Sequence, residues 1–412
     1  MVPVTVHRAK WVAPVSSPVV EDGAVAVAGG RIVAVGRAYD LRREFTGPIF
    51  DHGEGAILPA LVNAHVHLEF SALRGTLTPT DNLGDWLNSA LAGYAALSPE
   101  EIGRGIACGL AELRRFGTIL VGEVSNTGRS LLPLAASGLG YHYFFECLGF
   151  DLLEKRPLED DFPVFATAQA LSRTNFSAAA HAPYSVSEAL FLRVRTWNAR
   201  YQRPSTVHLA ESQEERQFLR EGNGFFRELL ERRGRWPNNY KAPGCSPAAL
   251  LDRLDFLQPD TLAVHGLWLD PEDLAILARR RTWLVLCPRS NRFTGAGFPD
   301  LPALRQAGVR LALGTDSLAG NDDLNLFKEM SCLHEQFPGF PIPELLAWGT
   351  LNGAAALNRA AELGSLTPGK NAALLFIPVK ARREFWPELL QAGAAGHISW
   401  IAAADKEKPG GH

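Results

Sequence analysis

Eight short apolar runs, separated by segments long enough to form helices, restrict the fold more than any other feature of this chain. The runs are Ala56–Ala64, Thr118–Val124, Tyr141–Cys147, Phe176–Ala180, Ser205–Ala210, Thr261–His265, Thr282–Cys287 and Val309–Thr315. Between them lie amphipathic segments such as Pro99–Gly117, which follows a capping Ser98 and ends at a glycine. Eight β–α units over roughly 260–300 residues predict an α/β fold, a (β/α)8 TIM-like barrel. A doubly wound sheet is the alternative, but no GxGxxG follows the first run.

The two ends of the chain have a different pattern. The segments Val4–Val12 and Ala24–Arg37 are typical of strands, with Gly29-Gly30 as a turn, and Gly364–Val379 returns to strand character. We expect the N- and C-terminal segments to build one small β-sandwich domain beside the barrel. The expected domains are 1–56 for its N-terminal part, 57–362 for the hydrolase barrel, and 363–412 for its C-terminal part plus a polar tail at 404–412.

Composition excludes several functional classes. The chain has 41 Lys+Arg against 44 Asp+Glu, a net charge of -3, which argues against a nucleic-acid-binding face. No apolar run reaches the roughly 18–20 residues that span a bilayer, and no signal peptide is evident at the N-terminus. The five cysteines are scattered without a CxxC, which favours a reducing, cytoplasmic location.

Histidines gather where these strands should end. Of eleven in the chain, five lie at predicted strand ends: His65, His67, His181, His208 and His265. Active sites of such barrels lie at the carboxyl ends of the strands. The sequence therefore predicts that these imidazoles meet at one site.

A metal site is the simplest use of this cluster. His65 and His67 are two residues apart on a strand, so both side chains leave the same face and offer nitrogen ligands suited to Zn or Fe. His208 supplies a third nitrogen and Asp316 an anionic oxygen, which leaves a coordination position for water. The alternatives are a chance HxH, a core histidine at 208, and Asp316 as a helix cap.

Two further residues suggest catalysis. Glu211 follows His208 in an HxxE pattern, where its carboxyl group can shuttle protons as a general acid/base. The alternative is a first-turn glutamate favoured by the helix dipole. His265 is not needed for a one-metal site, so it is expected to hydrogen-bond the nucleophilic water or polarise the substrate, or else to be a buried structural histidine.

Together these motifs resemble a known family. The segments PALVNAHVHLEFSALRG, HAPYSVS, VHLAESQEE, LAVHGLWLD, CPRSNRF and LALGTDSLAGNDDLNLFKEM resemble the amidohydrolase superfamily. The similarity is greatest to its mononuclear aminohydrolases, which include S-adenosylhomocysteine/methylthioadenosine deaminases, aminodeoxyfutalosine deaminases and triazine chlorohydrolases. The resemblance implies that His65, His67, His208 and Asp316 hold one divalent metal, Zn or Fe. It also implies that Glu211 is the proton shuttle and that His265, with Asp316, helps position the attacking water.

The resemblance also implies the reaction. Binuclear relatives carry a bridging lysine after the fourth strand, where this chain has His181-Ala182-Pro183, so a single metal is expected. The hypothesis is a hydrolytic deaminase of an aminated purine nucleoside-like heterocycle, in which a metal-activated hydroxide attacks the amino-bearing ring carbon. Aminodeoxyfutalosine, S-adenosylhomocysteine and methylthioadenosine are the candidate substrates.

Substrate contacts are predicted less specifically. His181 resembles a residue of the turn that touches the nucleoside in such deaminases, and Trp86 matches an aromatic residue of the lid after the first strand. Arg74 lies downstream of the HxH pair, where it can hold a distal polar group of the substrate. Arg289 and Asn291 follow the seventh run, where relatives have substrate contacts. Three of these residues have a structural alternative: backbone capping for His181, helix packing for Trp86 and an ion pair for Arg74. No acidic residue lies near Tyr94 to read ribose hydroxyls, as nucleoside deaminases of this branch commonly do.

Other functions stay open at this point. The same chemistry would serve a triazine or pterin chlorohydrolase or deaminase, or a cyclic amidase, and a metal-bound, non-catalytic binding protein is a further alternative. The expected partner is a small heterocyclic substrate, with no nucleic acid and no membrane. A homodimer is expected from the resemblance.

Overall fold

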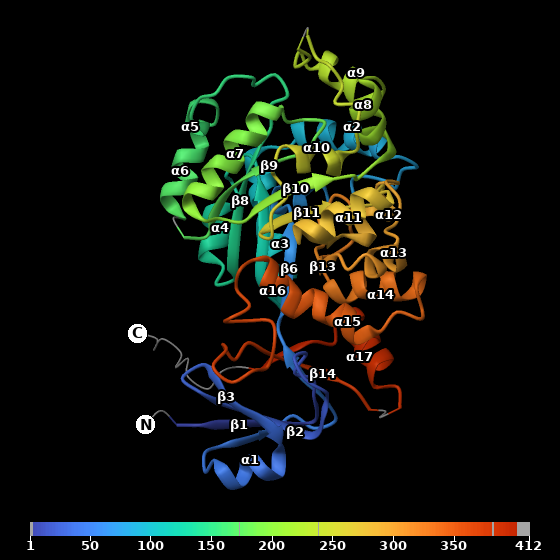
Figure 1. Cartoon of the computed structure of the whole chain (residues 1–412). Coiled ribbons are helices and arrows are strands. Elements are labelled where there is room, and N and C mark those ends of the chain that lie inside the picture. The colour runs from blue at the N-terminus through green and yellow to red at the C-terminus, as the bar shows by residue number, and fades with distance from the viewer. Residues whose placement is uncertain (1–2, 173, 238, 381–382, 402–412) are drawn as a thin grey trace. The chain divides into compact units, whose positions relative to one another are not determined.

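The computed structural model describes residues 3–172, 174–237, 239–380 and 383–401 of the 412-residue chain. They form two compact units, and Figure 1 labels their helices and strands. One unit contains the described residues of Met1–Asn63, Leu113–Ile119 and Asn325–His412, and the other contains Ala64–Glu112 and Leu120–Leu324. The polar tail predicted at 404–412 lies outside the described residues.

Every one of the eight predicted runs overlaps a strand, which confirms the α/β class. The strands are β6 (Leu61–Val66), β7 (Thr118–Ser125), β8 (Gly140–Cys147), β9 (Phe176–Ala180), β10 (Ser205–Leu209), β11 (Thr261–His265), β12 (Trp283–Leu286) and β13 (Arg310–Leu313). They form two four-stranded sheets, in the orders β6-β7-β8-β9 and β10-β11-β12-β13. Pairing is parallel from β7 to β9 and from β10 to β13, so their carboxyl ends lie at a common edge of each sheet.

Backbone hydrogen bonds also link the carboxyl ends of strands from the two sheets. The backbone N–H of His208 donates to the carbonyl of His181 at 2.8 Å. The N–H groups of Thr315 and Asp316 donate to the carbonyl of His65 at 3.1 and 3.2 Å. These bonds hold together the ends of β6, β9, β10 and the segment after β13, which carry the predicted site residues.

The first apolar run differs from its prediction. It contains two strands, β5 (Gly55–Pro59) and β6, rather than one strand over Ala56–Ala64. At Ala60 the chain passes from one sheet to another: its N–H donates to the carbonyl of Ala373, whereas the next N–H, of Leu61, donates to that of Gly117. Both strands are fully buried, so hydrophobicity alone does not mark the break.

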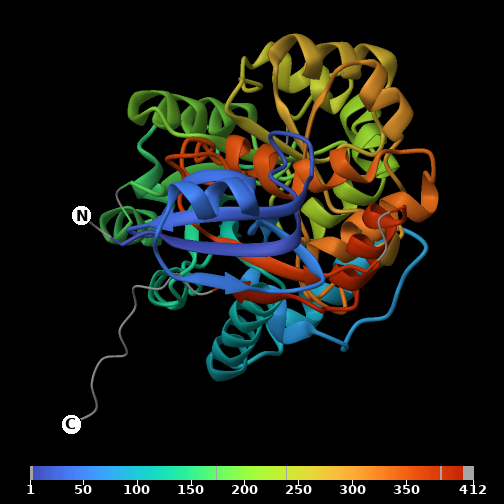
Figure 2. The same ribbon diagram turned by 90° about the horizontal axis from the view of Figure 1, so that it is seen from below.

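The chain ends share one mixed sheet. It contains β1 (Thr5–Val12), β2 (Val20–Ala28), β3 (Arg31–Arg37), β4 (Ile49–Asp51), β5, β14 (Leu374–Pro378) and β15 (Ser399–Ile401). The C-terminal β14 pairs antiparallel with β5, and β5 pairs parallel with β1. Helix α1 (Ala38–Glu44) packs on one face of these strands, as Figures 1 and 2 show, through Ala38 and Leu41. The strands form a single sheet, so the predicted β-sandwich is not confirmed.

The remaining helices follow the strands along the chain. One unit contains η1 (Leu68–Leu73), α2 (Leu83–Ala95), most of α3 (Pro99–Arg115), α4 (Leu131–Ala136), α5 (Leu158–Asp161), α6 (Pro163–Leu171), α7 (Glu188–Tyr201), α8 (Gln213–Glu221), α9 (Phe225–Arg232), α10 (Pro247–Arg253), α11 (Pro271–Arg280), α12 (Pro288–Phe293) and α13 (Leu301–Gln306). The other unit has α14 (Leu326–Gln336), α15 (Ile342–Ala347), η2 (Trp348–Asn352), α16 (Gly353–Ala356) and α17 (Phe385–Ala394). Among the described residues, none of these helices combines the length and apolar character needed to cross a membrane.

Candidate active site

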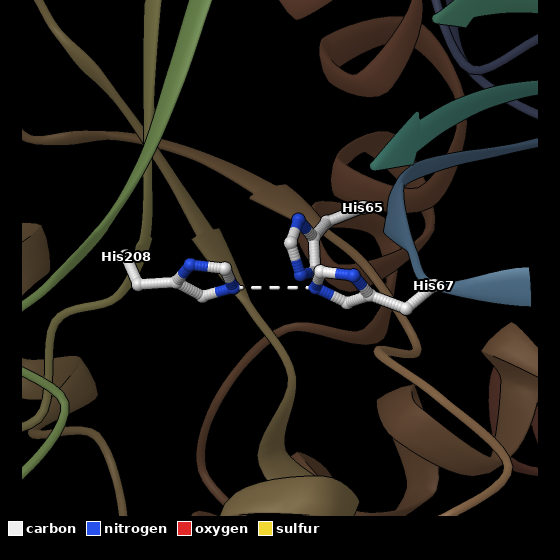
Figure 3. A group of neighbouring side chains, drawn as sticks. All are labelled: His65, His67 and His208. Atoms are coloured by element: carbon white, nitrogen blue, oxygen red, sulfur yellow. Dashed lines mark hydrogen bonds between the residues drawn. The ribbon is translucent and has the colours of Figure 1, made fainter. Parts of the chain in front are cut away.

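Three histidines from two strands converge at the carboxyl ends of the parallel sheets. His65 lies on β6, His67 directly follows it, and His208 lies on β10. The Nε2 atoms of His67 and His208 are 3.3 Å apart, and the rings of His65 and His67 are 4.7 Å apart between centroids. Figure 3 shows the three imidazoles turned toward one another. All three are buried, so each nitrogen is withdrawn from bulk water.

The protonation of these imidazoles suits a cation. Burial, the largest cause in each case, lowers the pKa of His65, His67 and His208, which favours the neutral ring. His208 Nδ1 lies 2.9 Å from the carbonyl oxygen of His181, and His67 also hydrogen-bonds to the backbone of Val124. Each neutral ring has one proton and donates it to a carbonyl oxygen. The Nε2 atoms of His67 and His208 then carry lone pairs, which face each other across 3.3 Å. A divalent metal ion between them would replace this repulsion with two ligand bonds.

Asp316 brings a carboxylate to the same group. Its Oδ1 lies 3.9 Å from Nε2 of both His65 and His67. Ser290 donates a hydrogen bond from Oγ to its Oδ2 at 2.5 Å, which leaves Oδ1 toward the imidazoles. Asp316 and His265 both have left-handed backbones, with φ of 56° and 75°. Such conformations are costly for non-glycine residues and are concentrated at functional sites.

A second group of potential ligands overlaps the first. Glu146, His181 and His208 also lie close enough to share an ion. His208 cannot serve two ions with one nitrogen, and its Nδ1 is already bonded to the carbonyl of His181. The nitrogen of His208 that stays available, Nε2, faces His67 of the first group.

Glu211 lies beside this group, at the start of helix α8. The backbone N–H of Glu211 donates to the Glu215 carboxylate at 2.9 Å, and Ser212 Oγ accepts from the N–H of Glu215 at 3.2 Å. These two bonds form a capping arrangement that fixes the chain at Glu211. Burial raises the pKa of the Glu211 carboxyl group, so it holds a proton more readily than an exposed glutamate.

His265 is oriented toward Glu211 by a neighbour. Its Nε2 lies 3.4 Å from Glu211 Oε1, and its Nδ1 lies 2.7 Å from Asn291 Oδ1. Because the amide oxygen can only accept, the proton of a neutral His265 ring belongs on Nδ1. The Nε2 lone pair then faces Glu211, and a proton can pass between the two side chains.

These residues open into one cavity of about 350 Å³. Its lining includes His67, His208, Glu211, His265 and Asp316. Two of the predicted substrate contacts, His181 and Trp86, also line it. His181 is held by Ser185, whose Oγ lies 2.6 Å from its Nδ1, and burial lowers its pKa to about 3.

The other three predicted substrate contacts do not line this cavity. Arg74 Nη1 donates to Glu112 Oε1 at 3.1 Å, the ion pair that the sequence left open as its alternative. Arg289 Nη1 donates to Asp323 Oδ1 at 2.9 Å. Asn291 is buried against His265, so it touches the cavity residue rather than the cavity itself.

Sequence reasoning missed several residues of the site. Glu146, at the end of β8, lines the cavity together with Asn126 and Phe226. Glu123 and Glu69 are buried as well: the Glu123 carboxylate accepts from the N–H of Leu68 at 3.2 Å, and Glu69 accepts from Ser125 Oγ at 2.5 Å. The signal that marks Glu123 and Glu146 is a glutamate inside an otherwise apolar strand, in TILVGEV and YHYFFEC.

Comparison with known proteins shows which family this chain belongs to. The amidohydrolase family profile matches residues 56–392. An aminodeoxyfutalosine deaminase of Nitratiruptor is 29% identical over 371 residues, which cover 87% of this chain and 88% of that protein. A 5-methylthioadenosine/S-adenosylhomocysteine deaminase of Syntrophobacter fumaroxidans is also 29% identical, over 87% of this chain and 80% of the relative.

Solved structures agree with these relatives. Aminofutalosine deaminase of Helicobacter pylori, in complex with methylthio-coformycin, superposes with a TM-score of 0.82 at 26% identity, covering 96% of this chain and 97% of that one. An adenosine deaminase of Xanthomonas campestris with bound zinc has a TM-score of 0.80 at 27% identity, covering 96% of this chain and 90% of that one. The chain therefore belongs to the amidohydrolase family, and is an enzyme that hydrolyses C–N bonds.

Proposed function

We propose that this chain is a metal-dependent deaminase of an aminated purine nucleoside. The observation that carries the proposal is the pair of Glu211 and His265, 3.4 Å apart, in the same cavity as the His65, His67, His208 and Asp316 group. A non-catalytic binding protein has no need of such a proton-transfer pair. The deaminase names of the relatives support aminodeoxyfutalosine, S-adenosylhomocysteine or methylthioadenosine as the substrate.

The residues that would hold the ion are His65, His67, His208 and Asp316. Three neutral nitrogens and one carboxylate suit zinc or iron, and the zinc in the Xanthomonas structure supports zinc. When bound there, a divalent ion supplies Lewis-acid chemistry, which lowers the pKa of water toward neutrality.

Proton transfer falls to this chain's own side chains. Glu211 delivers a proton to the ring nitrogen next to the amino-bearing carbon, for which its raised pKa suits it. Having given up that proton, Glu211 takes one proton of the attacking water from His265, 3.4 Å away, and passes it to the departing amino group. The second proton of the water restores the Glu211 carboxyl group, so that water and the amine become a ring carbonyl and ammonia. His265, held by Asn291, presents Nε2 to accept the proton of the attacking water. His181 and Trp86, on the cavity wall, are the proposed substrate contacts. Arg74 and Arg289 would act only indirectly, through their ion pairs.

The proposal also includes the domain organisation of the chain. The two parallel sheets would act as one (β/α)8 barrel of residues 57–362, with 1–56 and 363–412 as the small β domain. The hydrogen bonds from Thr315 and Asp316 to His65, and from His208 to His181, support this closure. A cytoplasmic location and a homodimer remain predictions.

Ammonia release tests the proposal directly. The purified enzyme is offered methylthioadenosine, S-adenosylhomocysteine, aminodeoxyfutalosine, a chloro-s-triazine and an aminopterin. Ammonia release and, for the triazine, chloride release are followed, and the metal content is measured on the same sample. We expect ammonia from at least one adenine nucleoside. Glu211→Gln should lose most turnover, by roughly a hundredfold to ten-thousandfold, with the metal retained. Turnover of the triazine or pterin alone would contradict the proposal, as would metal loss in the variant.

A further inference from the structure

Glu146 is a buried carboxyl group that the proposed reaction does not use. It lies at the end of β8, is 4% exposed and lines the cavity. Its Oε1 has no hydrogen-bond partner among the described residues. The nearest imidazole nitrogen, His208 Nδ1, is 3.7 Å away and is bonded to the carbonyl of His181 instead. A buried acceptor without a partner is costly, so a ligand that supplies a donor at this point gains binding energy.

The residues that follow Glu146 on the cavity wall do not supply a side-chain donor for its unpartnered oxygen. Leu148, Gly149 and Phe150, which follow Cys147 along the chain, also line the cavity, and they offer no side-chain hydrogen-bond donor. Asn126, on the same cavity, hydrogen-bonds to Glu146 and holds its carboxyl group in place. The free oxygen is therefore a fixed acceptor between this apolar part of the wall and the imidazoles of His181 and His208.

We propose that Glu146 is a specificity-determining residue that accepts a hydrogen bond from a sugar hydroxyl of the nucleoside substrate. This inference rests on the proposed function. The reacting carbon must lie near Glu211 and His265, whose side chains are 3.4 Å apart, whereas the neighbours of the Glu146 carboxyl group are Asn126 and His208. The part of the substrate that reaches Glu146 is therefore not the reacting amino group. In methylthioadenosine the only other hydrogen-bond donors are the 2′ and 3′ hydroxyl groups, because the ring nitrogens carry no proton.

Deoxy substrates test this inference. The variants Glu146→Leu, which removes the acceptor, and Glu146→Gln, which keeps one, are compared with the unchanged enzyme on methylthioadenosine and its 2′-deoxy and 3′-deoxy forms. Both kcat/KM for ammonia release and the calorimetric Kd are measured. We expect Glu146→Leu to lower kcat/KM for methylthioadenosine roughly 10- to 100-fold, and Glu146→Gln to lower it less. For one deoxy form the ratio between the enzyme and Glu146→Leu should fall to about one.

A control variant and the pattern of losses distinguish a specificity role of Glu146 from a structural role. Glu112 is also buried, but its carboxylate is paired with Arg74 outside the cavity, so Glu112→Gln should leave the ribose-to-deoxy ratio unchanged. Equal losses by Glu146→Leu on all three nucleosides, with metal content or thermal stability reduced, would show a structural role and overturn the inference. An enzyme that binds these nucleosides with the expected deoxy preference but releases no ammonia would refute the proposed function and leave Glu146 in its role. An enzyme that binds none of them overturns both.

Discussion

The Nε2 atoms of His67 and His208 lie 3.3 Å apart although the two residues are 141 positions apart in the chain. Each ring uses another hydrogen bond to a backbone carbonyl, which fixes its orientation. Neutral imidazoles held in this way are preorganised to bind a metal ion, and their orientation does not depend on the ion.

Removal of the metal is the first test of this arrangement. Because the proposed ion would bind the folded chain and not the unfolded one, chelation should abolish ammonia release and lower the unfolding temperature. Readdition of zinc or iron should restore both, and elemental analysis should give about one ion per chain. His208→Ala should bind no ion after the same treatment. Full activity in a chelated sample that contains no metal would contradict the assignment of these ligands.

Asn291 should act through His265. Replacement by Leu removes the acceptor for His265 Nδ1, so the ring loses its fixed orientation toward Glu211. We expect a roughly 10- to 100-fold loss of kcat with little change in KM or metal content. Asn291→Asp retains an acceptor oxygen and should keep more of the activity than Asn291→Leu. Equal activity of the Leu variant and the unchanged enzyme would remove Asn291 from the site.

His7, in the mixed sheet, should make folding sensitive to acid. Its Nδ1 lies 3.2 Å from His52 Nε2, its ring stacks on Phe50, and burial lowers its pKa from 6.5 to about 4. Between these values the unfolded chain binds the proton more readily than the folded one. The stability contributed by neutral His7 is thus complete above pH 6.5 and is lost as pH falls toward 4.

The measurement is the midpoint of urea unfolding between pH 7.5 and 4.5. His7→Phe keeps an aromatic ring and removes the titration, so its midpoint should fall less with acid than that of the unchanged protein. His397→Phe alters an exposed histidine and provides the control. Identical pH profiles for all three proteins would show that His7 does not contribute.

The sequence predicted the strands better than their grouping into sheets. A run of buried apolar residues marks a strand, but β5 and β6 belong to different sheets, and within the run only Pro59, the last residue of β5, marks the break at Ala60. The convergence of His65, His67, His208 and Asp316 could be predicted because all four follow or end parallel strands. The sequence could not predict whether a charged side chain after a strand faces the cavity. Arg74 and Arg289 turn to Glu112 and Asp323, whereas Glu146, inside a strand, faces the cavity.

Gly314 should be required for the position of His65, one of the proposed metal ligands. A Cβ at this residue would lie 2.8 Å from both Cβ and the carbonyl oxygen of His65, closer than real contacts allow. Gly314→Ala must therefore displace His65 or the end of β13, and we expect metal affinity to fall roughly 10- to 100-fold. Gly103→Ala, in helix α3, meets no atom within 4 Å and should stabilise the protein by up to about 1 kcal/mol without changing metal affinity. Titration of the metal-free proteins with zinc compares the two variants, and an unchanged zinc affinity in Gly314→Ala would show that the site tolerates the shift.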